Sequence, residues 1–297
     1  MTAILRKYTN EFKAGRHLKG PDATELLDAM IAETDESMLA DIFRAWDKKG
    51  IEADEIHSIA QIMRERAVKV RSKHEQFVDI VGTGGSKIKT FNVSTAAAFV
   101  VAGAGLPVAK HGNKAATSNS GSADVLSELG VEPAVDAATA ERNLNEIGIC
   151  FMFAPNFHRL SATLGKVRRG LGFPTIFNCV GPLCNPASAP YQVIGVWEKE
   201  LVSKMAEALA RLGTKKSWIV HGSDGLDEIS LSGPTFVAEV VGSKTREFII
   251  SPEDFGEKAE SIMSFKADSA VESAKIIKSI FGGKHRSDAI QTLVSVN

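Results

Sequence analysis

The spacing of apolar residues changes along the chain and predicts two structural regions. Through residues 1 to about 70, apolar side chains recur every three or four positions, which is typical of amphipathic helices. One such face has the spacing i, i+3, i+4 and i+7: Leu39, Ile42, Phe43 and Trp46. We expect Asp22 and Glu25 to form a capping box at the start of an earlier helix, and Gly50 to end this one.

From about residue 71, short apolar runs alternate with longer helical segments. The alternation predicts buried parallel strands joined by helices. The expected strands are Phe77 to Val81, Leu106 to Ala109, Ile149 to Phe153, Gln192 to Trp197 and Ser217 to Val220. Two further runs, Phe236 to Val241 and Glu247 to Ile250, are expected to pair as antiparallel strands at one edge. The segment from Phe173 to Pro186 is rich in chain breakers, so we expect an ordered loop there.

These patterns together predict an α/β protein with two domains. Residues 1–70 would form a small helical domain, joined in space by part of residues 158–190. Residues 71–297 would form a large α/β domain, in which helices flank a mostly parallel central sheet. Loops that follow parallel strands meet at one edge of such a sheet, and ligands bind there.

Charge and cysteine content narrow the possible functions. The chain has 35 Lys and Arg against 36 Asp and Glu, so no global basic field would recruit nucleic acid or an anionic membrane surface. The three cysteines, Cys150, Cys179 and Cys184, fit buried thiols in a reducing compartment better than disulfides or a metal site. The first residues contain no continuous apolar segment of the kind found in signal peptides, and no apolar run approaches the length of a membrane span. We therefore expect a soluble, cytoplasmic protein.

A glycine-rich turn follows the first expected strand. In Gly82-Thr83-Gly84-Gly85, missing side chains allow backbone N–H groups to approach a ligand closely, which suits a phosphate. Ser94 and Thr95 are expected to cap the helix that follows. A turn of this kind is more often simply a tight turn, and it matches neither the P-loop nor the dinucleotide fingerprint.

The loop after the second expected strand has similar chemistry. It begins with the cation Lys110 and ends at Ser122, where another helix is expected to start. The polar groups between them are on Asn113, Thr117, Ser118, Asn119 and Ser120. Two helix starts and a lysine around one crevice predict a ligand with more than one phosphate. His111 alone would more often be a structural histidine.

Two adjacent carboxylates, Asp227 and Glu228, follow a later expected strand. Such a pair is usually a solvated acidic turn. Here the loop shares the sheet edge with the expected phosphate binders, and carboxylates beside a diphosphate are ligands that Mg²⁺ prefers. Asp227 and Glu228 are therefore candidate magnesium ligands.

The motifs, in this order, closely resemble those of the anthranilate phosphoribosyltransferases. They are Gly82 to Gly85, Thr90 to Thr95, Lys110 to Asn113 and Ser120 to Asp124, and the resemblance extends over nearly the whole chain. It implies a nucleoside phosphorylase-like fold, with residues 71–297 as the catalytic domain. It also implies transfer of the 5-phosphoribosyl group from phosphoribosyl diphosphate to the amine of anthranilate in tryptophan biosynthesis. Two Mg²⁺ ions per active site, and a homodimer formed through the helical domain, are implied as well.

The resemblance assigns roles to individual residues. Phosphoribosyl diphosphate would contact Gly82, Thr83, Gly84, Gly85, Ser86, Thr90, Asn92, Ser94, Thr95, Lys110 and Ser122. Anthranilate would contact Gly82, His111, Asn113, His158 and Arg168, whose guanidinium can grip a carboxylate with two parallel hydrogen bonds. Ser94, Asp227 and Glu228 would bind metal, and Lys110, Asp227 and Glu228 would stabilise the transition state and the leaving group. An aromatic amine is already neutral near pH 7, so no general base is assigned.

The sequence departs from the family pattern at several positions. Ser86 replaces the usual aspartate, Lys114 an arginine and Arg159 a proline, while Pro174 stands where a basic residue is common. The chain stops at Asn297, where the family would continue with an alanine-rich helix and one more, so we expect less helical packing on the large domain. Two alternatives follow. One is a pyrimidine nucleoside phosphorylase-like enzyme, which magnesium dependence would argue against, and the other is a catalytically degenerate relative that acts as a binding protein.

Overall fold

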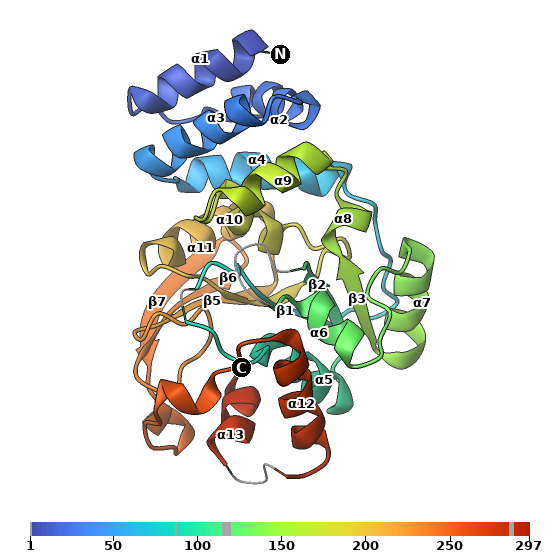
Figure 1. Ribbon diagram of the computed structural model, residues 1–297. Coiled ribbons are helices and arrows are strands. Elements are labelled where there is room, and N and C mark those ends of the chain that lie inside the picture. Colours follow the sequence, from blue (N-terminus) through green and yellow to red (C-terminus); the bar gives the residue numbers. More distant parts are fainter. Residues whose placement is uncertain (1, 87, 115–119, 285–287) are drawn as a thin grey trace.

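The computed structural model describes residues 2–86, 88–114, 120–284 and 288–297. Helices α1 to α4 form a stack at one end of the molecule, and the segments that follow α8 return to it (Figure 1). The stack and the helices packed on it are α1 (Thr2–Lys13), α2 (Ala23–Ala32), α3 (Glu36–Lys49), α4 (Ala53–Arg66), α9 (Ala162–Gly170) and α10 (Ile176–Leu183). No helix in the described ranges is long and apolar enough to cross a membrane.

Capping explains where the helices of the stack begin and end. Gly50 ends α3 with a φ of 88°, as expected. The capping box expected at Asp22 is wrong, because Asp22 closes a 3₁₀ turn, Gly20–Asp22, that runs directly into α2. Its backbone is already helical, so its side chain makes no capping hydrogen bond.

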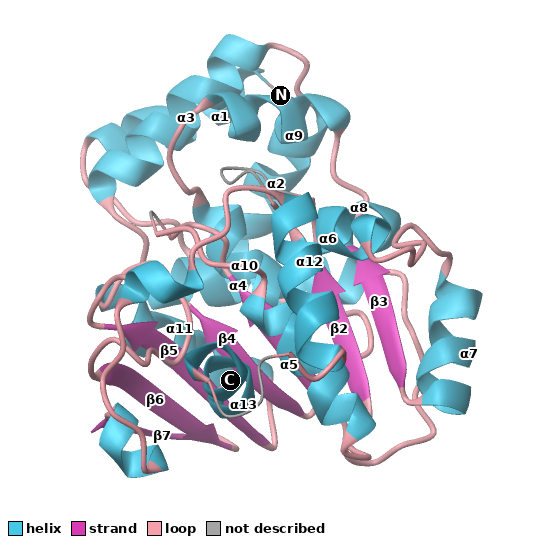
Figure 2. Cartoon of the chain, turned by 60° about the horizontal axis from the view of Figure 1, so that its bottom comes forward, coloured by secondary structure: helices cyan, strands magenta, loops and turns pink. Residues whose placement is uncertain are grey.

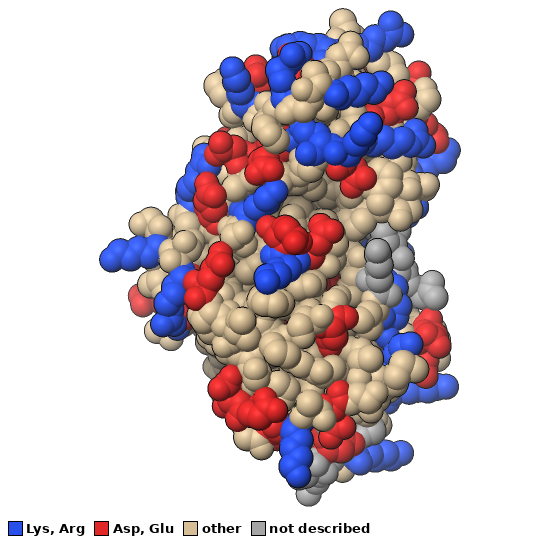
Figure 3. Space-filling view, turned by 90° about the vertical axis from the view of Figure 1, so that its left-hand side faces the viewer, with Lys and Arg blue, Asp and Glu red and all other residues tan. Residues whose placement is uncertain are grey.

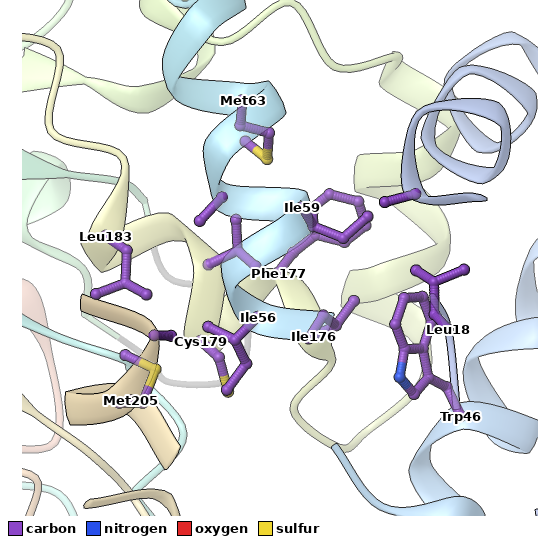
Figure 4. Packing of buried hydrophobic residues seen from close by; sticks show 14 of the residues in the cluster. Leu18, Trp46, Ile56, Ile59, Met63, Ile176, Phe177, Cys179, Leu183 and Met205 are labelled. Atoms are coloured by element: carbon purple, nitrogen blue, oxygen red, sulfur yellow. The ribbon is translucent and has the colours of Figure 1, made fainter. Parts of the chain in front are cut away.

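The apolar core of this end is built around α4. Ile56, Ile59 and Met63 are buried there, with Phe177 of α10 nearby and Trp46 of α3 farther along (Figure 4). The expected loop from Phe173 to Pro186 contains α10 instead. Burial of Phe177 and most of its neighbours favours the helix over local propensity, and the Thr175 N–H donates to Asn178 Oδ1 at its start, 3.0 Å away.

A buried ion pair joins α3 to α4 within the stack. Lys49 Nζ lies 2.8 Å from both carboxylate oxygens of Glu55, and both side chains are almost fully buried. Glu55 also accepts hydrogen bonds from Leu18 N and Trp46 Nε1. These bonds fix the α1–α2 connection, α3 and α4 against one another.

Replacing Lys49 by methionine should lower the free energy of unfolding by about 3–5 kcal/mol, because the Glu55 carboxylate would stay buried without its cation. Urea denaturation followed by circular dichroism measures the change. Lys48→Met, at the exposed neighbouring position, is the matched control. Equal stability of the two variants would contradict the prediction.

Seven strands form one sheet in the order β3-β2-β1-β4-β5-β6-β7 among the described residues. They are β1 (Val78–Gly82), β2 (Val108–Gly112), β3 (Ile149–Phe153), β4 (Tyr191–Gly195), β5 (Lys216–Gly222), β6 (Thr235–Val241) and β7 (Lys244–Ile250). The strands from β3 to β5 are parallel, and β6 and β7 are antiparallel at one edge, as the sequence predicts. The fold is therefore α/β with a mostly parallel sheet, and the expected fold class is confirmed.

Helices cover both faces of the sheet (Figure 2). On one face α11 (Glu200–Leu212) contacts β5, β6 and β7, while α5 (Val93–Gly103) contacts β1, β2 and β3 on the other. The remaining elements are α6 (Ser122–Glu128), α7 (Ala137–Ile147), α8 (Ala154–Phe157), α12 (Ala270–Phe281), α13 (Ala289–Val296) and the 3₁₀ turns Pro252–Phe255 and Ile262–Phe265. Alternate side chains of β1 and β4 enter the two cores, as shown by Ile80 on the α5 side and Val81 on the α11 side.

The chain changes direction across the sheet at β1. From β1 it continues to β2 and β3 on one side, and later returns to β4 on the other. Gly82 and Gly195 are paired neighbours at the carboxyl ends of β1 and β4. Open α/β sheets bind ligands at such a switch point.

Candidate functional site

A cavity of about 860 Å³ lies at the carboxyl ends of the parallel strands and extends to α9 and α10. Most of the residues assigned from the sequence line it: Gly82, Thr83, Gly84, Ser86, Thr90, Asn92, Ser94, His111, Asn113, Ser122, His158, Arg168, Asp227 and Glu228. Gly85, Thr95 and Lys110 are not among the described residues that line it. Thr117, Ser118 and Asn119 fall outside the described residues.

The glycine loop and the acidic loop meet inside this cavity. The Gly84 N–H donates to Asp227 Oδ2 at 3.2 Å. Asp227 fits there because its neighbours lack side chains: a Cβ at Gly82 would lie 2.9 Å from Asp227 Oδ2, and one at Gly195 would lie 1.6 Å from Asp227 O. Gly85 packs on the indole of Trp197, which a Cβ would approach to 2.7 Å. The paired glycines form the slot that holds the acidic loop.

Asn92 caps α5 and directs its first turn toward the cavity. Its Oδ1 accepts from Thr95 N at 3.1 Å, so the capping role expected of Ser94 and Thr95 is wrong. The N-cap is the residue just before a helix, and its backbone angles are not helical. In α5 that residue is Asn92. Ser94 lines the cavity instead, and its Oγ accepts a hydrogen bond from Lys110 Nζ at 3.2 Å.

Lys110 is buried beneath Ser94, with only 3% of its surface exposed. Its ammonium donates to Ile80 O and to Ser94 Oγ. Burial lowers the pKa of Lys110 to about 8, while Asp79 and Glu228 favour its charged form. The lysine therefore supplies positive charge from behind the α5 N-terminus.

Asp79, on β1, is a buried carboxylate that the sequence analysis missed. It accepts from Asn185 Nδ2 at 2.8 Å and from His111 N at 3.1 Å. Burial raises the pKa of Asp79 to about 6, against the opposing effect of Lys110. Asp79 therefore holds the carboxyl-terminal part of β2, which includes His111 and leads into the second loop.

Asp227 and Glu228 bring two adjacent carboxylates to the cavity, beside the glycine loop. Burial raises the pKa of both carboxyl groups, and the Asp227 charge raises that of Glu228 further. Glu228 Oε2 is buried and has no hydrogen-bond partner among the described atoms. These donors fit a hard cation, and Mg²⁺ is usually held by one or two carboxylates together with substrate phosphates. The described residues hold no group of three or more His, Cys, Asp or Glu side chains that could bind metal alone.

The far end of the cavity combines aromatic, amide and cationic groups. His111 Nε2 and His158 Nε2 lie 3.2 Å apart. Arg168 Nε donates to Thr175 Oγ1 at 3.1 Å, and its guanidinium lies over the Phe177 ring at 5.1 Å. This end suits a flat acceptor with a carboxylate.

The histidine pair makes stability depend on pH. Burial lowers the pKa of His111 to about 3 and that of His158 to about 4. Below pH 6.5 the unfolded chain therefore takes up protons that the folded chain does not, and stability falls. His158→Gln should reduce this slope by about 1.2 kcal/mol per pH unit between pH 6 and 5. Urea denaturation at both pH values measures it, and an unchanged slope would contradict the prediction.

The sequence model of the "Glycosyl transferase family, a/b domain" matches residues 74–297. Anthranilate phosphoribosyltransferase of Pelotomaculum thermopropionicum is 42% identical over 95% of this chain and 82% of its own. The corresponding Moorella thermoacetica protein is 40% identical over 94% of this chain and 83% of its own.

Solved structures of anthranilate phosphoribosyltransferases are also similar to this chain. Anthranilate phosphoribosyltransferase (TrpD) from Thermus thermophilus has a TM-score of 0.85 and 36% identity, covering 97% of this chain and 85% of that one. The Saccharomyces cerevisiae protein in complex with PRPP and Mg has a TM-score of 0.87 and 30% identity, covering 98% of this chain and 86% of that one.

The chain belongs to the anthranilate phosphoribosyltransferase family. The departures from the family pattern lie at different distances from the site. In this member of the anthranilate phosphoribosyltransferase family, Ser86 and Lys114 line the cavity. Arg159 is exposed and does not line it. Ser86 Oγ lies 3.0 Å from Gly225 O, so the substituted residue links the glycine loop to the acidic loop. Asn178 also joins the two ends of the cavity, since its Nδ2 donates to Thr83 O at 3.0 Å.

Proposed function

We propose that this chain transfers the 5-phosphoribosyl group from phosphoribosyl diphosphate to the amine of anthranilate, releasing diphosphate. The reaction makes it a pentosyl-transferring glycosyltransferase of tryptophan biosynthesis. The observation that carries the proposal is the contact between Gly84 N and Asp227 Oδ2 within a cavity that continues to Arg168. A phosphate-type loop, oxygen ligands for a cation and a carboxylate-binding end therefore share one cavity.

The donor would lie at the carboxyl ends of β1 and β2. The glycine loop and the first turn of α5 offer backbone N–H groups and a positive helix end to the diphosphate. Lys110 adds charge from behind Ser94, and the loop from Asn113 to Ser122 would hold the 5-phosphate. Gly85 and Thr95, which do not line the cavity, would act through the position of their neighbours.

Ser94, Asp227 and Glu228 would hold Mg²⁺, two ions per active site. When bound, the ions would neutralise charge that builds up on the leaving diphosphate. The unpartnered Glu228 Oε2 and the Ser94 hydroxyl on the cavity wall support this assignment. Lys110, Asp227 and Glu228 would thus stabilise the transition state in which the ribose C1–O bond breaks.

Anthranilate would lie between Gly82, His111, Asn113, His158 and Arg168. The Arg168 guanidinium would pair with the carboxylate, and burial keeps both histidines neutral near pH 7, so they would not attract it as cations. The amine is neutral at that pH and needs orientation rather than deprotonation before attack. No general base is therefore assigned.

We also propose the larger organisation implied by the resemblance: a helical domain of residues 1–70 with part of 158–190, a catalytic domain of residues 71–297, a cytoplasmic location and a homodimer formed through the helical domain. Within the described residues, no large apolar side chain of 2–70 is exposed. Lys, Arg, Asp and Glu intermix over this end of the face in Figure 3. The dimer contact would therefore be largely polar, and light scattering at rising salt concentration tests it.

The decisive test is formation of phosphoribosyl anthranilate, followed by loss of anthranilate fluorescence with and without Mg²⁺. Magnesium-dependent turnover is expected. Phosphorolysis of a pyrimidine nucleoside by inorganic phosphate without Mg²⁺ would instead support the nucleoside phosphorylase alternative. Absence of turnover and of phosphoribosyl diphosphate binding in calorimetry would support a degenerate binding protein.

A further inference from the structure

Lys89 is a second lysine beside the glycine loop, and none of the assignments above uses it. Its side chain is half-buried and lines the cavity. The Lys89 ammonium donates to Ser86 O at 2.8 Å. It is also attracted by the Asp227 carboxylate. The cation therefore lies beside the glycine loop and within electrostatic reach of the acidic loop, the two elements expected to surround the diphosphate.

The environment of Lys89 differs from that of Lys110. Lys110 is only 3% exposed, and its ammonium is directed to Ile80 O and Ser94 Oγ. Among the described residues, Lys89 forms no ion pair within 4.0 Å. Its ammonium has three N–H donors, and its hydrogen bond within the described protein goes to Ser86 O. The ammonium can therefore donate to a ligand in the cavity.

The residue at position 86 determines whether the positive charge of Lys89 is neutralised by a neighbouring side chain. Ser86 Oγ lies 3.0 Å from Gly225 O and 3.1 Å from Ile88 O, so the side chain is held within the protein. A serine hydroxyl carries no charge and cannot form an ion pair with Lys89. An aspartate at this position would place a carboxylate within a few residues of the ammonium and compete with an anionic ligand.

We propose that Lys89 binds the diphosphate end of the phosphoribosyl donor, with Ser86 leaving its charge available. The inference rests on the proposed function and deepens it. As the ribose C1–O bond breaks, its electron pair leaves with the diphosphate, and the Lys89 ammonium stabilises the added negative charge by a charge-assisted hydrogen bond. The amine nitrogen forms the new bond to C1 and then loses its proton to water, while Lys89 keeps its own.

Binding of inorganic pyrophosphate in the absence of divalent metal tests the proposal directly. Isothermal titration calorimetry should show about tenfold weaker binding for Lys89→Met, because one charge-assisted hydrogen bond is lost. Lys89→Arg keeps the charge and should stay within about threefold of the unaltered chain. Lys48→Met, an exposed lysine far along the sequence, is the control for a general change in charge. Unchanged binding by Lys89→Met would overturn the proposal.

Ser86→Asp provides an independent test that does not remove Lys89. In the unaltered background it should weaken metal-free pyrophosphate binding, by repulsion and by pairing with Lys89. In the Lys89→Met background the pairing is lost, so the two effects should be non-additive. Strict additivity would overturn the proposed role of Ser86.

Turnover measurements separate this inference from the proposed function. If the chain makes phosphoribosyl anthranilate, Lys89→Met should raise the KM for the donor and lower kcat, with the KM for anthranilate unchanged. Turnover with no change in donor KM or kcat would overturn the role of Lys89 and leave the proposed function standing. Lys89-dependent pyrophosphate binding without turnover would support Lys89 as a diphosphate ligand and contradict the proposed acceptor.

Discussion

Replacing Asp227 by asparagine should lower kcat/KM for phosphoribosyl transfer by about 10²–10³-fold. Asparagine has the same shape and its Oδ1 can still accept the Gly84 N–H, so the contact between the two loops can persist. What it removes is the negative charge that would hold Mg²⁺ beside the diphosphate. The loss should therefore come from weaker metal binding and a less stabilised leaving group.

The measurement is steady-state anthranilate fluorescence at several Mg²⁺ concentrations. Asp227→Asn should need more Mg²⁺ for half-maximal rate, and the double variant Asp227→Ala/Glu228→Ala should have no detectable turnover. Glu207→Gln, an exposed carboxylate on α11, is the control and should match the unaltered chain. An unchanged rate and Mg²⁺ requirement in Asp227→Asn would remove this carboxylate from the mechanism.

Most of the sheet could be predicted from the sequence because its strands are buried on both faces. Such strands appear as short apolar runs. Ile149 to Phe153 is a continuous example, and the run from Phe77 to Val81 is interrupted only by Asp79. The site loops were also predictable, since the glycine turn starts at the end of β1 and Asp227-Glu228 lies in the loop that follows β5. Parallel order then brings them to one edge.

Local rules failed where tertiary contacts decide the conformation. Glycine and proline in the segment 173–186 predict a loop, yet burial of nearly every side chain in α10 favours a helix, and Pro182 falls in its last turn. At α5, Ser94, Thr95 and Asn92 are all capable caps by type. Only the backbone of residue 92 identifies the true N-cap.

Contacts between distant residues left no local signal. Asp79 is surrounded by apolar strand residues in the sequence, and its role depends on Asn185, more than a hundred residues away. Trp197 reads as one more apolar position, although its ring supports Gly85. Asn178 similarly reaches Thr83 O from α10. A single sequence gives residue types near one another in the chain, and these three positions act through partners that only the fold brings close.

Gly195→Ala should reduce turnover more than about 100-fold, because it would displace the acidic loop. The added Cβ would lie 1.6 Å from Asp227 O and 2.4 Å from Asp227 C, and backbone atoms cannot rotate away as a flexible side chain can. Gly195 is the paired neighbour of Gly82, and Thr83 N donates to Gly195 O at 2.9 Å. A shift at this position would therefore move the acidic loop relative to the glycine loop.

Gly103→Ala is the matched control, since a Cβ there meets no atom within 4 Å. It lies at the end of α5 and should leave turnover unchanged while keeping or slightly raising stability. Turnover by anthranilate fluorescence and pyrophosphate binding by calorimetry should both fall in Gly195→Ala, with circular dichroism showing that the sheet is retained. If Gly195→Ala turned over as fast as Gly103→Ala, the acidic loop would be able to work in a shifted position. The slot between the two paired glycines would then not set the geometry of the donor site.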